Sequence, residues 1–264
     1  PALIGMFILT GGVLWSNFRK HKVNVAESKR ERDLKIISSS SVQSLILESA
    51  QDVSKVISKC NDIYLGSING LARLNAEDLR TSKKEVSRLG KEIDKLRNEL
   101  FYFIQEIEEE NVMASHFYIS LISILEDMAQ SLEYITKASY KHVNNNHRQL
   151  KYSQIKELKE TQADLEGLLS DVRFAFDING YEAFATFADK KEELFANIDA
   201  KINQQVQRTR SKEEKSPKNT TLFFGLMVET KDLIVATINL IEHYHLHYDP
   251  TVTPKKLGDE QKNK

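Results

Sequence analysis

Apolar residues recur at helical spacing along almost the whole of this chain, and no run alternates between apolar and polar residues for long enough to indicate a β-strand. The clearest runs place apolar residues three or four positions apart, a spacing typical of a helix buried along one stripe in a bundle. They are Val86, Leu89, Ile93, Leu96, Leu100 and Ile104, followed by Leu121, Leu125, Met128, Leu132 and Ile135. The pattern predicts an all-α fold of six long helices, at about residues 40–66, 75–108, 111–140, 149–176, 182–210 and 220–248.

Turn-forming residues mark the breaks between these helices. A Ser-Ile-Asn-Gly sequence ends at Gly70, and an Asp-Ile-Asn-Gly sequence ends at Gly180, where the glycine suits a helix C-cap. Three consecutive Asn residues at 144–146 interrupt the third helix. We expect residues 211–219, with Pro217, to form a polar linker before the sixth helix.

The first three predicted helices resemble the last three. A shift of 106 residues carries the apolar run of the third helix onto Met227, Lys231, Ile234, Ile238 and Ile241, so four of five positions stay apolar. A shift of 105 residues carries Ile93-Asp94 onto Ile198-Asp199. Near-equal offsets in two helices predict two tandem three-helix bundles, with repeat one at residues 38–146 and repeat two at residues 147–247.

Residues 1–18 contain no charge, and the mostly apolar stretch from Ala2 to Trp15 is soon followed by Arg19-Lys20-His21-Lys22. A spanning helix needs about 20 apolar residues, so we expect residues 1–18 to be the end of a longer transmembrane helix. Trp15 would lie near the headgroups, and the basic residues would mark the cytoplasmic side. A signal peptide and an apolar core helix are the alternatives.

This interpretation places the protein at the inner (plasma) membrane, with the chain from about residue 19 onward on the cytoplasmic side. Residues 19–37 would form a basic, charged linker, and residues 248–264 a disordered tail. The expected contacts are with the lipid bilayer at the N-terminus.

Composition narrows the class of protein. The formal net charge is -1 and the pI is about 6.8, so the chain lacks the broad basic surface that nucleic acid requires. The single cysteine, Cys60, excludes an internal disulfide, and we expect it to be a small apolar filler rather than a reactive thiol. No glycine-rich phosphate loop or Ser/His/Asp arrangement is evident, and we therefore expect a protein that is not an enzyme.

Three features together resemble a known family. They are the Ile-Asp pair in each second helix (Lys91-Glu-Ile-Asp94 and Ala196-Asn-Ile-Asp199), the third-helix sequence from Leu125 to Ile135, and the tandem three-helix bundles. This combination resembles the PhoU proteins of bacterial phosphate regulation. With a membrane helix in front, it is similar to the C-terminal part of a PiT-type inorganic phosphate transporter that carries a fused PhoU-like cytoplasmic domain.

The resemblance implies a regulatory domain without catalysis. Phosphate uptake, coupled to a cation gradient, would occur in the membrane part, which would also be the main partner of this domain. The resemblance leaves a homodimer open. Two alternatives remain: a coiled-coil signalling or stalk domain of a membrane receptor, and a standalone PhoU-type regulator.

The resemblance also implies metal sites built from Glu/Asp-x-x-x-Asp motifs, and here the sequence departs from the family. The first acid of the motif matches Glu126 and Asp232, but the second is replaced by Gln130 and Ala236. The candidate ligands of a divalent or iron-type metal are therefore Asp94 with Glu126, and Asp199 with Asp232. A hard-cation cluster needs six or more oxygen ligands, so the alternative is a solvated charged face, and no other cofactor is expected.

Two weaker motifs are further candidate sites. His243 and His247 are four residues apart and would share a helix face, as a two-His zinc site requires, whereas His245 would point away. A plain helix end is the alternative, because His is favoured near a helix C-terminus. Asn219-Thr220-Thr221 matches a glycosylation acceptor, but a cytoplasmic segment would not meet that machinery. A soluble metal-dependent hydrolase would need a more complete ligand set.

Overall fold

The computed structural model describes residues 42–106 and 112–251. The predicted membrane-helix end (1–18), the linker (19–37) and most of the predicted tail lie outside these residues. Within the described ranges the chain forms six long α-helices, one short 3-10 helix and no strand, so the all-α class is confirmed. The helices are α2 (Val42–Arg73), α3 (Ala76–Glu106), α4 (Val112–Asn144), α5 (Tyr152–Ile178), α6 (Phe184–Arg210) and α7 (Pro217–His247), with η2 (Tyr181–Ala183) before α6.

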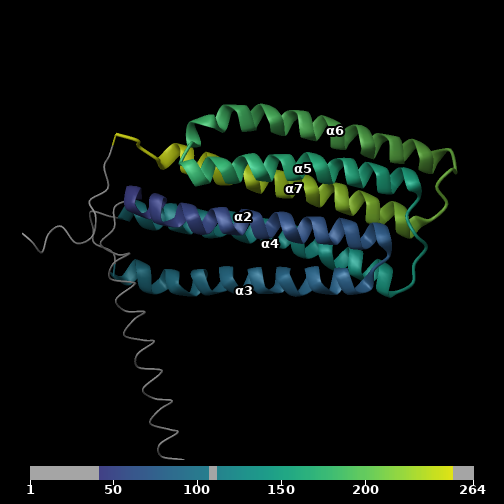
Figure 1. The fold of residues 1–264 in the computed structure, drawn as a ribbon, viewed down its shortest axis with the longest axis horizontal. Helices are drawn as coiled ribbons and strands as arrows, with labels where there is room; N and C mark the ends of the chain where they lie inside the picture. The colour runs from purple at the N-terminus through teal and green to yellow at the C-terminus, as the bar shows by residue number, and fades with distance from the viewer. Residues whose placement is uncertain (1–41, 107–111, 252–264) are drawn as a thin grey trace, which may run out of the picture.

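The helices lie side by side along the long axis of the molecule, and successive helices run in opposite directions (Figure 1). α3 and α6 are the outermost helices, and the other four lie between them. α2, α3 and α4 all contact one another, and so do α5, α6 and α7. The two sets contact each other mainly through α2 with α5 and through α4 with α7. In both sets each helix therefore contacts the other two, and the first and third helices of one set contact those of the other.

Most residues of the two predicted apolar runs lie in the core. All five residues of the run from Leu121 to Ile135 are at least 97% buried, as are Val86, Leu89 and Ile93 of α3. Ile104, at the end of the α3 run, is instead 45% exposed, because this last part of α3 lies beyond the packed core. Burial of each large aliphatic side chain contributes about 1.5–3 kcal/mol before chain entropy is subtracted, so the core runs hold the bundle together.

The first predicted turn is wrong: Ser67 to Gly70 lie inside α2, which continues to Arg73. The Ser67 hydroxyl donates to the Ile63 carbonyl at 2.7 Å, a bond that satisfies it within the helix. The chain turns at Leu74, whose φ is 55°, and Asn75 then caps α3. Its side-chain oxygen accepts from the backbone N–H groups of Glu77 and Asp78 at 3.0 and 3.2 Å.

Two further helix ends differ from the prediction. At the end of α5 the left-handed residue is Asn179, with a φ of 54°, and not Gly180. Asparagine tolerates the left-handed conformation better than most residues, so Asn179 can adopt it in place of the glycine. α7 begins at Pro217 rather than at residue 220, because Ser216 acts as the N-cap and proline suits the first helical position.

α4 is, among the described residues, the one helix long and apolar enough to cross a bilayer. Buried helices of globular cores meet the same criterion. α4 packs against α2, α3 and α7, which accounts for its apolar sequence.

The two ends of the bundle's chain meet. The side-chain amide of Gln43 donates to the His247 carbonyl at 2.5 Å, and its oxygen accepts from the Asp249 N–H at 2.9 Å. The ring of Tyr248 packs against Tyr181, with centroids 5.1 Å apart. Tyr248 and Asp249, the first two residues of the predicted tail, therefore contact the bundle.

Candidate functional site

Asp94 and Glu126, two of the four predicted metal ligands, lie close together because Arg97 binds both. Nη2 of Arg97 donates to Oδ1 of Asp94 at 2.6 Å, and Nη1 donates to Oε1 of Glu126 at 2.9 Å. Asp94 and Arg97 lie three residues apart on α3, and Glu126 comes from α4. All three border an open hollow of about 360 Å³. A guanidinium group thus joins the two carboxylates that the resemblance assigns to a metal.

Asp199, the third predicted ligand, is paired with a lysine of α7. Nζ of Lys231 donates to the two carboxylate oxygens of Asp199 at 2.9 and 3.0 Å. It also lies 4.4 Å from the ring centroid of Phe195, a cation–π distance. The offset of 105 residues that relates Asp94 to Asp199 relates Glu126 to Lys231, so the second unit has a lysine at the position of that glutamate.

Asp232, the fourth predicted ligand, lies one position further around α7 and faces another surface. It borders a hollow of about 840 Å³ between α4 and α7, together with Asp127 and Glu229. Burial first, and the negative charge of Asp232 second, raise the pKa of Glu229 above its ordinary value. Asp199 is not among the residues that line this hollow, so the pair Asp199 and Asp232 does not share it.

The donor set of these positions does not fit the multinuclear metal centre that the resemblance implies. In the described part of the chain, no three His, Cys, Asp or Glu residues come together in a group that could hold a metal ion. Asp94 and Glu126 supply only two carboxylates, and both are already paired with the single guanidinium group of Arg97. Ligation of a single ion at this pair stays a prediction, which elemental analysis with an Asp94→Asn, Glu126→Gln variant would test.

The three histidines near the end of α7 lie as their spacing predicts. Nε2 of His243 donates to the Phe117 carbonyl at 2.9 Å, and Nδ1 of His247 donates to the His243 carbonyl at 2.8 Å. The two rings are 4.7 Å apart, whereas His245 stacks on Phe184 of α6. One nitrogen of each paired ring is engaged with backbone, and in the described part of the chain no third His, Cys, Asp or Glu joins the two rings to complete a metal site.

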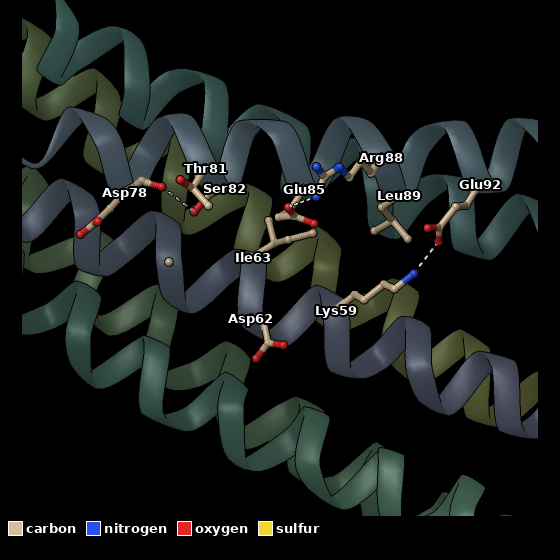
Figure 2. Close-up of a pocket in the computed structure, with 11 residues that line it drawn as sticks. Lys59, Asp62, Ile63, Asp78, Thr81, Ser82, Glu85, Arg88, Leu89 and Glu92 are labelled. Atoms are coloured by element: carbon tan, nitrogen blue, oxygen red, sulfur yellow. Dashed lines mark hydrogen bonds and ion pairs between the residues drawn. The ribbon is translucent and has the colours of Figure 1, made fainter.

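A groove between α2 and α3 was not evident in the sequence. It has a volume of about 490 Å³ and is lined mainly by charged side chains of the two helices. Figure 2 shows Lys59 reaching from α2 to Glu92 on α3, where Nζ and Oε2 are 2.6 Å apart. Arg88 pairs with Glu85 on the same helix at 2.5 Å. Most charges here are paired locally, so the groove presents no converging set for a ligand.

A well-shielded ion pair joins α5 to α6. The Arg208 guanidinium donates to the two carboxylate oxygens of Glu157 at 2.9 and 2.6 Å, in a bidentate arrangement. The side chains are only 19% and 10% exposed. Such a pair fixes the two helices relative to each other, and it is costly to break because the remaining charge stays buried.

Two residues of the weaker motifs are buried. Cys60 is fully buried, and burial raises the pKa of its thiol to about 12, as suits a filler and not a nucleophile. Asn219 is 1% exposed, and its side-chain amide donates to the Gln149 carbonyl at 2.9 Å. The folded bundle therefore hides the glycosylation acceptor.

The fold and these sites define an all-α helical bundle whose predicted site residues are, in the described ranges, mostly engaged in pairing and packing. Comparison with protein-family models, with curated proteins and with solved structures finds no match.

Proposed function

We propose that this chain is the cytoplasmic regulatory domain of a PiT-type inorganic phosphate transmembrane transporter, with a PhoU-like arrangement of two three-helix units. Phosphate would move through a membrane part to which residues 1–18 belong, and the bundle would modulate that part without any catalysis of its own. The membrane part of the same protein would be its main partner.

The observation that carries this proposal is the repetition of contacts in two sets of three helices. α2, α3 and α4 contact one another as α5, α6 and α7 do, and the sets join through α2–α5 and α4–α7. Asp94 and Asp199 occupy related places, each near a charged residue of the third helix of its set. This is the architecture on which the resemblance rests, and it supports the proposal together with the apolar segment at residues 2–15.

A stalk that dimerises along continuous heptads would instead form a long rod. The described helices fold back on one another, and the longest, with 33 residues, is about 50 Å long. Small-angle scattering on the full chain distinguishes the two: a maximum dimension far above one helix length for the helical part would favour the stalk. A standalone PhoU-type regulator would share the bundle but would not sediment with membranes.

The decisive experiment has two stages. The coding sequence upstream of Pro1 should encode several further apolar segments, with acidic residues in interrupted helices. Uptake of radiolabelled phosphate is then measured in cells that lack their own uptake systems and express the whole protein with or without residues 42–251. We expect the deletion to change the uptake rate or its dependence on external phosphate. An upstream soluble or periplasmic domain, or identical uptake, would contradict the proposal.

A further inference from the structure

Most of the strongly exposed large apolar side chains gather at one end of the bundle. Among the described residues six large apolar side chains are more than half exposed, and five of these lie within about five residues of the end of α3, α5 or α7 or of the start of α4. The five, here named the apolar end, are Phe101, Met113, Phe174, Ile178 and Leu246. The sixth, Tyr152, begins α5 at the opposite end.

The apolar end draws on four helices. α3, α5 and α7 end there and α4 begins there, as Figure 1 shows for the side of the molecule where α2 starts. The five side chains are 58–70% exposed. Isolated exposed apolar residues are ordinary on protein surfaces, but a concentration of them at one place marks a contact surface.

The chain that precedes the bundle joins it at this same end. α2 begins at Val42, and Gln43 is bonded to His247 and Asp249 at the end of α7. The first described residues of α2 therefore lie next to the end of α7 that carries Leu246, and the sequence before them includes the apolar stretch from Ala2 to Trp15. Under the proposed function, on which this inference rests, that stretch lies in the bilayer.

We propose that the apolar end lies against the surface of a lipid bilayer, with the helix axes of the bundle directed away from it. Residues 19–41 would span about 80 Å when fully extended, more than the length of any helix here. A stretch of this length would thus allow either end of the bundle to approach the membrane. The exposed apolar side chains are the reason to assign the membrane contact to the apolar end.

Site-directed quenching tests this orientation on the full chain in phosphatidylcholine vesicles. Cys60, which is fully buried, is first replaced by Ala, and single cysteines are introduced as Phe101→Cys, Met113→Cys or Leu246→Cys for a fluorescent label. Tyr152→Cys is the matched control, because Tyr152 is even more exposed than these three residues but lies at the opposite end. The vesicles carry nitroxide-labelled phosphatidylcholine as the quencher.

We expect the three labels at the apolar end to be quenched at least threefold more strongly than the label at residue 152. Equal quenching at both ends, or none at either, overturns the inference. Labels shielded from both lipid and aqueous quenchers would show that another part of the chain or a second copy covers the apolar end, which also overturns it. Flotation of the vesicles separates the two proposals: a chain that floats without the quenching difference refutes only the orientation, and a chain that does not float refutes the membrane segment.

Discussion

Lys231 of α7 holds Asp199 of α6 through both carboxylate oxygens, at 2.9 and 3.0 Å. The corresponding contact in the first unit joins Glu126 of α4 to Arg97 of α3, which also binds Asp94. The two units thus place opposite charges at related positions of their third helices. In both, a cation holds the aspartate of the second helix, and this gives the contact between second and third helices a measurable electrostatic component.

We expect Lys231→Glu to lower the free energy of unfolding by about 1–2 kcal/mol, because it removes an ion pair and a cation–π contact and adds repulsion with Asp199. Urea unfolding measures the change. Added Ca²⁺ or Mn²⁺ should restore part of the loss, since two carboxylates would then face each other. Lys137→Glu is the control, because Lys137 forms an exposed pair with Glu133 on one helix. Equal losses in the two variants would contradict this account.

Arg208→Ala should be far more destabilising, by about 3 kcal/mol, because it leaves the carboxylate of Glu157 buried without its partner. Arg208→Lys should recover only part of that loss, since lysine cannot form the bidentate pair. The free energy of unfolding is measured for both variants and for Lys55→Ala, whose exposed pair with Asp52 should contribute about 0.5 kcal/mol or less. A loss at Arg208 no larger than at Lys55 would rule out the shielded pair.

Gly70 and Gly90 should respond to alanine in opposite directions. A Cβ at Gly70 would lie 2.8 Å from Cγ of Leu79, so Gly70→Ala forces α2 and α3 apart and should cost about 1–3 kcal/mol. A Cβ at Gly90 meets no atom within 4 Å, so Gly90→Ala should stabilise the exposed helix by about 0.5–1 kcal/mol. Thermal unfolding of the two variants gives the sign directly, and stabilisation by both would refute the close approach at Gly70.

The stability of the bundle should depend on pH through His243. Burial lowers the pKa of His243 below its usual 6.5, and the charge of a protonated His247 lowers it further, although the bond to the Phe117 carbonyl opposes this. The unfolded chain therefore takes up the proton first as pH falls. The contribution of His243 is complete above pH 6.5 and is lost as pH falls from there toward its lower folded-state pKa.

Urea unfolding measured as the pH is lowered below 6.5 should show a smaller loss of stability in His243→Gln than in the parent protein. The difference between the two is the informative quantity, because other groups also titrate. His142, whose pKa burial also lowers, acts in the same sense, whereas Glu48 and Glu229, whose pKa values burial raises, act in the opposite sense. A variant with the same pH dependence as its parent would exclude His243 as a contributor.

Much of the fold could be predicted from the sequence because the apolar spacing records burial directly. The five residues of the run from Leu121 to Ile135 are all buried, and five of the six helices both begin and end within a few residues of the predicted positions. The error at Ser67 to Gly70 has a physical cause. Local preference indicates a turn at Asn-Gly, but Gly70 is needed inside α2 so that Leu79 of α3 can approach.

The candidate site was harder to predict from the sequence than the fold, because its residues come from different helices. The sequence placed Asp94 and Glu126 together, and they do share a partner. It could not show that the partner is Arg97, or that α7 turns Lys231 and not Asp232 toward Asp199, because neighbouring residues on a helix differ by about 100° in direction. A one-residue difference between the two offsets, 105 and 106, was the only signal of this change.

The bonds from Gln43 to His247 and Asp249 place the start and the finish of the bundle at a single point. A chain with this geometry could be circularly permuted: a short peptide would join residue 249 to residue 42, and new termini would open in the connection between α4 and α5. For the same reason the bundle could be inserted into a loop of a host protein without separating the flanking residues of the host. Such a module is transferable between proteins, because its attachment requires one site and not two.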